Sequence, residues 1–411
     1  MICILFMKKK VIYDMMMNIV ATAIPLIVLQ LLVLPQMAEK MTDAQYGLLV
    51  TVVAFMNVIP STFGNTLNNI RLLFQNKYDE KNKVGDFQII LLVSLLICAV
   101  ITIGFSIKYK TDFNFTGYLL SLILALLWLV REYYIVAYRL IINYTFIMLN
   151  NVVMVLGYLV GYYVFLRVGY WQIVYLAGLI VSILFVLFTS DIWKEPVRKT
   201  EFLAAVTSQS VMLLIAGLLA RVTVYADKLL LYPLLGGGVV AIYFAATVFG
   251  KIVSTAIAPI SSVALTYLSK MNKKSDNIFN QSMLISAVFC VFGYIVCILI
   301  SRPVLTYLYP QFVDEAMKYI YVTTATTVIY TMISILNPFI MKFCNMKWQI
   351  VISAVTAIVY MALCLILLHY YGLMGFCLGA LLTNIVKLLV MFIIYFKMSD
   401  GDSDKLTEVS A

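Results

Sequence analysis

Long apolar runs alternate along the chain with short charged or turn-rich breaks, and most of these runs are long enough to cross a membrane. An α-helix needs roughly 20 apolar residues to span the hydrocarbon core. The first six predicted spans cover roughly Asp14–Val33, Gln45–Leu73, Phe87–Ile107, Thr116–Ala137, Tyr144–Leu166 and Gln172–Ser190. The second six cover roughly Leu203–Tyr232, Val239–Leu268, Asn280–Ser301, Ile320–Met341, Gln349–His369 and Leu373–Phe396. The pattern therefore predicts an all-α polytopic membrane protein with twelve transmembrane helices.

The composition agrees with this interpretation. Of 411 residues, 64% are hydrophobic and only 12% are charged, whereas soluble domains carry about 25% charged residues. So apolar a chain cannot present a water-compatible surface, which excludes a soluble enzyme and a disordered regulator. The formal net charge of +10 is explained by membrane orientation rather than by nucleic-acid binding, because cytoplasmic loops are enriched in Lys and Arg.

The positions of the basic residues fix the expected orientation. With twelve spans, 19 of the 29 Lys and Arg residues fall at or near the side that holds both termini. Four fall within spans (Arg221, Lys228, Lys251 and Lys387), and six fall on the opposite side (Lys40, Lys108, Lys110, Arg167, Arg302 and Lys318). The positive-inside rule then places both termini in the cytoplasm.

Several features recur at an offset close to 200 residues, which indicates two related halves. The clearest pairs are Pro60 with Pro259, Asn143 with Asn345, and Gly169 with Gly372. We therefore expect a six-helix lobe over residues 1–195 and a second over 196–400, joined by the charged segment Asp191–Glu201 and followed by a short cytoplasmic tail, 401–411. Parallel repeats around a central cavity are an architecture of transporters that work by alternating access.

Four prolines lie inside predicted spans and are candidates for hinges: Pro25, Pro60, Pro259 and Pro338. Each removes a backbone hydrogen bond and bends its helix. Proline is also simply more frequent in transmembrane helices than in soluble ones, so the hinge interpretation rests mainly on the pairing of Pro60 with Pro259.

Charged side chains within the hydrocarbon are costly, which makes them functional candidates. They are Arg131, Glu132, Arg221, Asp227, Lys228, Lys251 and Lys387. The neighbours Arg131–Glu132 and Asp227–Lys228 also fit self-neutralising structural pairs. Lys251 and Lys387 have no acidic neighbour in the sequence and suit an anionic substrate, although Lys387 could instead extend to the membrane interface.

Two predicted spans carry polar stripes at helical spacing. The second has Asn57, Ser61, Asn65 and Asn68 or Asn69, and the eighth has Tyr243, Thr247, Lys251 and Thr255. Because the 200-residue offset relates these two spans, the stripes predict a hydrophilic cavity between the lobes. The alternative is interhelical hydrogen bonding without a cavity.

The sequence lacks the motifs of an ATP-driven pump, a zinc site or a nucleophilic enzyme. Its one histidine, His369, lies at the end of a predicted span beside two tyrosines, as interfacial residues do. Most of the seven cysteines fall in apolar runs without metal-ligand spacing and are expected to pack as small core residues. We therefore expect neither an enzyme nor a bound cofactor or metal.

One region is similar to a known family. Tyr225-Ala226-Asp227-Lys228-Leu229, followed by Pro233, Gly236 and the run 241–246, resembles the start of the second lobe in Wzx-type polysaccharide flippases, and Leu34-Pro35 with Tyr46-Gly47 resembles its first-lobe counterpart. These proteins belong to the MATE-like (MOP) exporter superfamily. The resemblance implies translocation of undecaprenyl-diphosphate-linked oligosaccharides across the bacterial cytoplasmic membrane, for O-antigen, capsule or exopolysaccharide. It also implies a cationic cavity, a proton or sodium gradient in some members, and possible partnership with a polymerase and a chain-length regulator. Related lipid II flippases usually have two further helices.

Under this interpretation Lys251, with Arg221 and Lys228, would contact the diphosphate through charge-assisted hydrogen bonds. Arg131 and Lys387 would add positive charge, and the Asn and Ser stripe would suit sugar hydroxyls. Glu132 and Asp227 are the expected sites for a coupling proton or sodium ion. Two alternatives stay open. A MATE-type multidrug or cation antiporter is disfavoured by the surplus of positive charge, and a membrane-embedded repeat-unit polymerase is disfavoured by the short outer loops.

Overall fold

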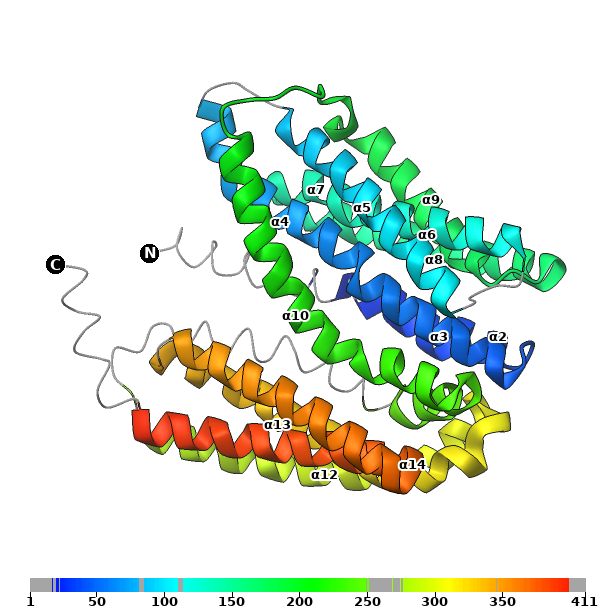
Figure 1. The fold of residues 1–411 in the computed structure, drawn as a ribbon, viewed down its shortest axis with the longest axis vertical. Helices are drawn as coiled ribbons and strands as arrows, with labels where there is room; N and C mark the ends of the chain where they lie inside the picture. The colour runs from blue at the N-terminus through cyan, green and yellow to red at the C-terminus, as the bar shows by residue number, and fades with distance from the viewer. Residues whose placement is uncertain are drawn as a thin grey trace. The chain divides into compact units, whose positions relative to one another are not determined.

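The computed structural model describes residues 23–80, 85–109, 114–248, 276–344 and 346–398, together with residues 17, 20, 21, 250, 268 and 274. Every regular element within these ranges is a helix, which confirms the all-α prediction (Figure 1). The chain divides into two compact units, residues 1–240 and 241–411.

The first apolar helix among the described residues of the first unit is Ala23–Ala38, which includes the π-helical turn η1 (Leu29–Val33) and α2 (Leu34–Ala38). The unit continues through α3 (Asp43–Val58), α4 (Pro60–Glu80), α5 (Asp86–Tyr109), α6 (Phe115–Tyr134), α7 (Val136–Leu140), α8 (Tyr144–Val168), α9 (Gln172–Thr189), the short η2 (Ile192–Lys194) and α10 (Leu203–Leu235).

Local sequence signals set several of these ends. Thr42 and Gln45 form a capping box at the start of α3, and the Asn143 side chain caps α8 by accepting from the Phe146 amide. Gly169 ends α8 in the left-handed region, with φ of 83°, where glycine is favoured. The sequence expectation that Gly169 turns the chain between two spans is thus confirmed.

Two helix crossings in the first unit depend on glycine. A Cβ on Gly64 of α4 would lie 2.5 Å from the Cβ of Glu132 and 2.7 Å from the carbonyl oxygen of Leu129, both on α6. In the crossing of α8 and α9, Gly157 and Gly178 bring the two backbones into similarly close contact. Small residues allow such approach between membrane helices, where packing replaces the hydrophobic effect as the main source of association.

Buried polar contacts anchor the segment between α9 and α10 to the rest of the first unit. Glu195 accepts two hydrogen bonds from the Arg71 guanidinium, at 2.6 and 3.1 Å, and the fully buried Asp86 accepts from the Thr200 amide at 2.7 Å and from the Tyr78 hydroxyl at 2.6 Å. Burial raises the pKa of Glu195, with the Arg71 charge opposing it, and burial raises the pKa of Tyr78.

The second unit contains α12 (Asp276–Leu308), η3 (Pro310–Phe312), α13 (Val313–Phe343) and α14 (Met346–Met398). α14 is interrupted at Gly372, where φ is 58° and ψ is −140°. This break confirms that Gly372 turns the chain between the last two predicted spans. The core at one end is aromatic, with the Phe279 and Tyr395 rings stacked at 3.9 Å.

The helices carry the surface expected in a bilayer. Leu96 on α5, and Ile285 and Leu299 on α12, are each about 70% exposed. Such side chains are stable against lipid and unfavourable in water. The chain is therefore a multi-pass membrane protein by its helix lengths, apolarity and exposed faces.

Within the described residues, eight helices are long and apolar enough to cross a membrane, and the bent α10 makes a ninth. One of the eight, Trp348–Lys397, includes the Gly372 break and thus two predicted spans. The exact count of twelve stays a prediction. The two six-helix lobes, divided between residues 195 and 196, also stay a prediction. The two compact units of the structure are divided at a different point, between Val240 and Ala241.

Candidate functional site

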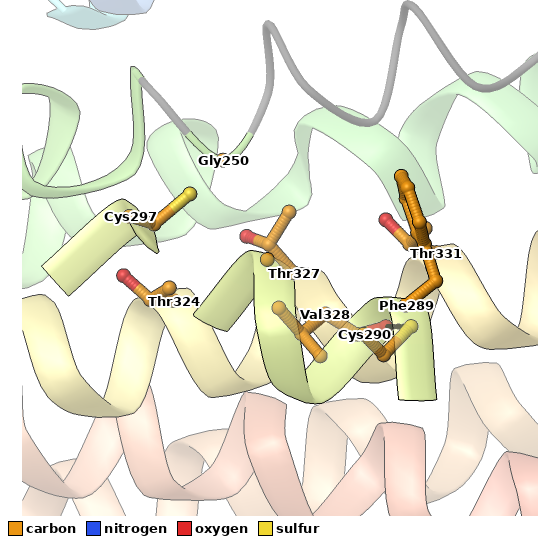
Figure 2. A pocket seen from close by; sticks show the side chains of 9 residues that line it. Gly250, Phe289, Cys290, Cys297, Thr324, Thr327, Val328 and Thr331 are labelled. Carbon is orange, nitrogen blue, oxygen red and sulfur yellow. Dashed lines mark hydrogen bonds between the residues drawn. The ribbon is translucent and has the colours of Figure 1, made fainter. Parts of the chain in front are cut away.

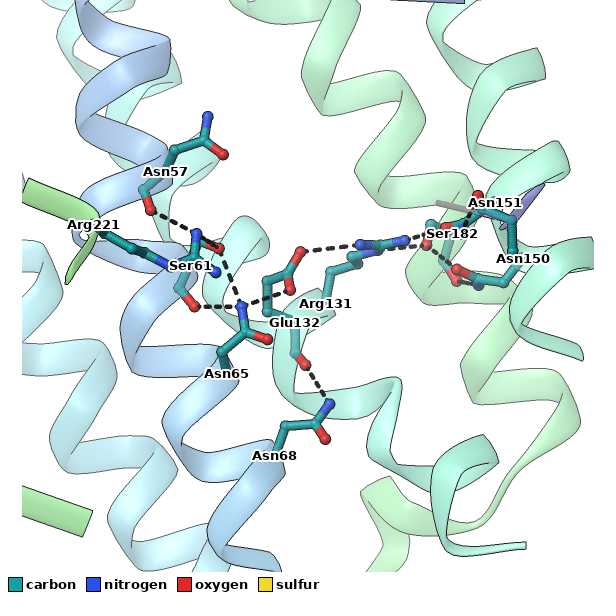
Figure 3. Close-up of polar contacts among 11 residues, drawn as sticks. Asn57, Ser61, Asn65, Asn68, Arg131, Glu132, Asn150, Asn151, Ser182 and Arg221 are labelled. Carbon is teal, nitrogen blue, oxygen red and sulfur yellow. Dashed lines mark hydrogen bonds and ion pairs between the residues drawn. The ribbon is translucent and has the colours of Figure 1, made fainter. Parts of the chain in front are cut away.

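A connected polar network runs through the first unit at the level of the predicted spans (Figure 3). The central part of this network is the polar stripe on α3 and α4. The Asn65 carboxamide donates to the Ser61 carbonyl oxygen at 2.9 Å and to the Ser61 hydroxyl at 3.2 Å. Asn57 bonds within its own helix, donating to the Val53 carbonyl oxygen at 2.9 Å. The Asn57 side chain thus bonds back into α3, while Ser61 and Asn65 contact each other on α4.

α6 supplies the acidic member of the network. The Glu132 carboxylate accepts from the Asn65 carboxamide at 3.1 Å and from the Arg131 guanidinium at 3.0 Å. Asn68 donates to the Glu132 backbone carbonyl at 2.9 Å. The close α4–α6 crossing at Gly64 makes these contacts possible, because any Cβ there would collide with Glu132.

Arg131 extends the network to α8 and α9. Its guanidinium donates to the Asn151 carboxamide oxygen and, at 3.4 Å, to the Ser182 hydroxyl. Ser182 in turn donates to Asn150 at 2.8 Å, and the Asn150 carboxamide donates to the Ser182 carbonyl oxygen at 2.8 Å. Asn150, Asn151 and Ser182 were not among the expected site residues. Two adjacent asparagines in an apolar run are the signal that could have identified them.

α10 brings a second arginine to the stripe. α10 bends by 63° between its stretches Leu203–Leu219 and Val224–Leu235, and Arg221 lies at the bend. Its guanidinium donates to the Asn57 carbonyl oxygen at 2.9 Å and to the Ser61 hydroxyl at 2.8 Å. No carboxylate within the described residues pairs with Arg221. Arg131, by contrast, pairs with Glu132.

Around Ser61 and Asn65 the network therefore carries the guanidinium charges of Arg131 and Arg221 and the carboxylate charge of Glu132. Both members of the Arg131–Glu132 pair are mostly buried, with side chains 12% and 20% exposed. In such surroundings a paired charge is held in place. A guanidinium such as that of Arg221, with two of its five N–H donors engaged, can bind an added anion. The arrangement suits an anionic group better than a cationic one.

Asp227 and Lys228 form a second buried pair on α10, with 3.0 Å between the carboxylate and the ammonium nitrogen. The side chains are 9% and 4% exposed. Arg131–Glu132 and Asp227–Lys228, the two neighbouring pairs noted in the sequence, thus both form ion pairs, as a structural role requires. A role of Glu132 and Asp227 in ion coupling stays a prediction.

The remaining candidates lie in the second unit or outside the described residues. Lys387 of α14 lies 6.0 Å from the centre of the Tyr330 ring. Tyr243 is buried with its ring 5.8 Å from that of Phe376. Within the short apolar helix Gly237–Val248, the Thr247 hydroxyl donates to the Tyr243 carbonyl oxygen. Lys251, Thr255 and Pro259 fall outside the described residues, so the polar stripe of the eighth predicted span is described only at Tyr243 and Thr247.

The prolines that the structure describes behave differently from one another. Pro60 is the first residue of α4, one residue after α3 ends, within the single candidate membrane span Asp43–Gln75. Pro25 is buried in the helix Ala23–Ala38, and Pro338 lies inside the continuous α13. Their action as hinges stays a prediction.

A small crevice in the second unit lies between α12 and α13 beside Gly250 (Figure 2). Two cysteines, Cys290 and Cys297, line it together with three threonines of α13 (Thr324, Thr327 and Thr331). None of the described residues that line it is charged, so these residues do not offer the binding chemistry of the first-unit network. Among the described residues, no group of His, Cys, Asp and Glu side chains is arranged to hold a metal ion.

Comparison with solved structures identifies proteins that share this fold. No protein-family model and no curated protein matches the sequence, but solved structures do match. An inward-facing multidrug resistance MATE family transporter of the MOP superfamily aligns over 96% of both chains, with a TM-score of 0.61 and 12% identity. The lipid II flippase MurJ, in an inward closed conformation, aligns over 99% of this chain and 90% of its own, with a TM-score of 0.68 and 14% identity.

This chain has the fold of the MATE and MurJ transporters. An outward-facing MATE transporter also aligns, over 95% of this chain and 96% of its own, with a TM-score of 0.56 and 13% identity. These proteins are transporters and a flippase rather than enzymes. At 12–14% identity this likeness shows the fold that the chain shares with these proteins, and it does not distinguish the Wzx type from other proteins of this fold.

Proposed function

We propose that this protein is a flippase that moves undecaprenyl-diphosphate-linked oligosaccharide repeat units from the inner to the outer leaflet of the bacterial cytoplasmic membrane, by alternating access, for surface polysaccharide assembly. Both termini would face the cytoplasm, and a polymerase and a chain-length regulator are possible partners. Three lines support the proposal: the fold shared with transporters that include a lipid II flippase, the local sequence resemblance, and the charge of the network.

The observation that carries the proposal is the unpaired Arg221 on the Asn and Ser stripe. Its guanidinium is held by Asn57 and Ser61 and has no carboxylate partner in the described part of the chain. A diphosphate offers a guanidinium two or more charge-assisted hydrogen bonds. The adjacent Asn65 and Ser61 provide amide and hydroxyl groups that match sugar hydroxyls. Lys228, Lys251 and Lys387 are further candidates for cargo contact, and Glu132 and Asp227 for the coupling ion.

A second candidate function is a MATE-type multidrug or cation antiporter, which the same fold supports. Such a protein needs an accessible carboxylate for its cationic substrate. The Glu132 carboxylate is instead engaged by Arg131 and Asn65, so the first-unit network favours an anionic cargo.

The experiment uses a deletion strain. Lipid-linked oligosaccharides are extracted, and their sidedness is measured with a membrane-impermeant sugar-modifying reagent. Single repeat units trapped on the cytoplasmic face, with surface polymer lost, are the expected result. Single units on the outer face would mean that polymerisation has failed. Normal surface polymer combined with new sensitivity to organic cations would favour the antiporter.

A further inference from the structure

Arg139 lies at the end of α7, where the α4 stripe continues beyond Glu132. Its guanidinium nitrogen Nη1 donates to the Asn68 carboxamide oxygen at 2.6 Å and to the Asn69 carboxamide oxygen at 3.0 Å. The Asn68 amide nitrogen is itself engaged, donating to the Glu132 carbonyl oxygen, which fixes its oxygen toward Arg139. The Nη1 group of Arg139 is therefore engaged by the two asparagines, and the N–H donors on Nε and Nη2 can bind a ligand.

Arg139 differs from Arg71 and Arg131, two other arginines on this side of the predicted topology. Arg71 pairs with Glu195, and Arg131 pairs with Glu132. No carboxylate in the described ranges pairs with Arg139, although the side chain is half-buried. Burying a cation without an anionic partner is costly, so a site that keeps one favours an anion from outside the protein.

The turn directly after Arg139 is strained and apolar. Ile142 has a φ of 52°, in the left-handed region that β-branched residues rarely adopt. The hydrogen bonds from the Ile142 amide to the Arg139 carbonyl and from the Asn143 amide to the Tyr138 carbonyl close this turn. Ile141 and Ile142, which follow Arg139 closely in the chain, are 67% and 65% exposed.

We propose that Arg139, Ile141 and Ile142 form a binding site for the diphosphate headgroup of a lipid. The guanidinium fork matches phosphate oxygens, and the two exposed isoleucines offer apolar surface that the hydrocarbon chain of the lipid would cover. The proposal rests on the proposed function for its role, which is to hold the lipid-linked cargo at the end of the stripe before it reaches Arg221. Binding itself is measured without transport.

The test uses the purified full-length protein in detergent with farnesyl diphosphate as the probe, measured by isothermal titration calorimetry. Arg139→Gln should weaken binding about tenfold or more, the expected loss for a hydrogen bond to a charged group. Arg139→Lys should retain part of the affinity. Arg198→Gln removes the same charge from an exposed arginine and should bind as the wild type does.

A second variant covers the case in which Arg139→Gln fails to fold. Ile141→Ser changes only an exposed side chain, and it should weaken binding of farnesyl diphosphate while leaving binding of inorganic pyrophosphate unchanged. Wild-type affinity in both variants, or an equal loss in Arg198→Gln, would overturn the site. Equal competition by phosphatidylglycerol would overturn the diphosphate assignment. Specific binding at Arg139 in a protein that flips no lipid-linked sugar would instead refute the proposed function alone.

Discussion

The ion pair at the centre of the first-unit network gives a prediction that can be worked from the structure. Glu132→Gln preserves the shape of the side chain but removes its charge. The carboxylate now accepts from Arg131 at 3.0 Å and from Asn65 at 3.1 Å. A carboxamide has one acceptor oxygen, so it can satisfy only one of these donors without reorientation, and its own amide group adds a donor that faces them.

The expected loss is about 2 kcal/mol of unfolding free energy. A hydrogen bond to a charged group contributes about 1.5–3 kcal/mol, and breaking a fully buried ion pair costs about 3–5 kcal/mol. The Arg131 and Glu132 side chains are 12% and 20% exposed. Because the pair is not fully buried, the expected cost lies in the range for a hydrogen bond to a charged group rather than in that for a fully buried ion pair. Arg131 keeps its bonds to Asn151 and Ser182, and these limit the loss further.

A double-mutant cycle with Arg131→Gln isolates the pair. Unfolding in mixed detergent micelles is followed by tryptophan fluorescence, for which Trp128 lies on the same helix. The double variant should be less destabilised than the sum of the single variants by about 1–2 kcal/mol. Asp191→Asn, which breaks the exposed Lys194–Asp191 pair, is the control and should change stability by less than about 0.5 kcal/mol. A neutral Glu132→Gln, or strict additivity in the cycle, would refute the reasoning.

Three further predictions concern other parts of the first unit. Arg221→Gln should abolish transport while the protein stays folded in the membrane, measured as surface polymer in a complemented deletion strain; normal polymer would contradict the role of this cation. Gly64→Val should destabilise the protein by about 1–3 kcal/mol through overpacking against α6, whereas Gly104→Ala, where a Cβ meets no atom within 4 Å, should be neutral or slightly stabilising in the same unfolding assay. Glu195→Ala should leave Arg71 buried and unpaired and release the segment before α10, seen as faster proteolysis after Lys194; an unchanged cleavage rate would show that the ion pair does not anchor it.

Much of the fold could be predicted because membrane helices are recognisable in a sequence as long apolar runs. The predicted spans Phe87–Ile107 and Tyr144–Leu166 correspond to α5 and α8 within two residues at each end. The turns at Gly169 and Gly372 were also predictable, because both glycines separate apolar runs. In the structure both adopt a positive φ.

The network was only partly predictable, for a physical reason. Helical periodicity placed Ser61 and Asn65 on one face, and intramembrane charge marked Glu132 and Arg221. Which residues meet depends on the crossing of helices, and the sequence pattern does not contain the crossing angle. The contact of Asn65 with Glu132 depends on the missing side chain of Gly64, and nothing in the linear sequence distinguishes this glycine from others in apolar runs.

The direct test of the central claim is reconstitution. The purified protein is placed in liposomes that contain an undecaprenyl-diphosphate-linked oligosaccharide, and exposure of the sugar to a membrane-impermeant reagent is followed over time, with Arg221→Gln liposomes as the matched control. We predict that wild-type protein makes the protected fraction of the sugar accessible and that the Arg221→Gln protein does not. Unchanged protection with wild-type protein, together with uptake of an organic cation by the same liposomes, would contradict the flippase account and establish an antiporter.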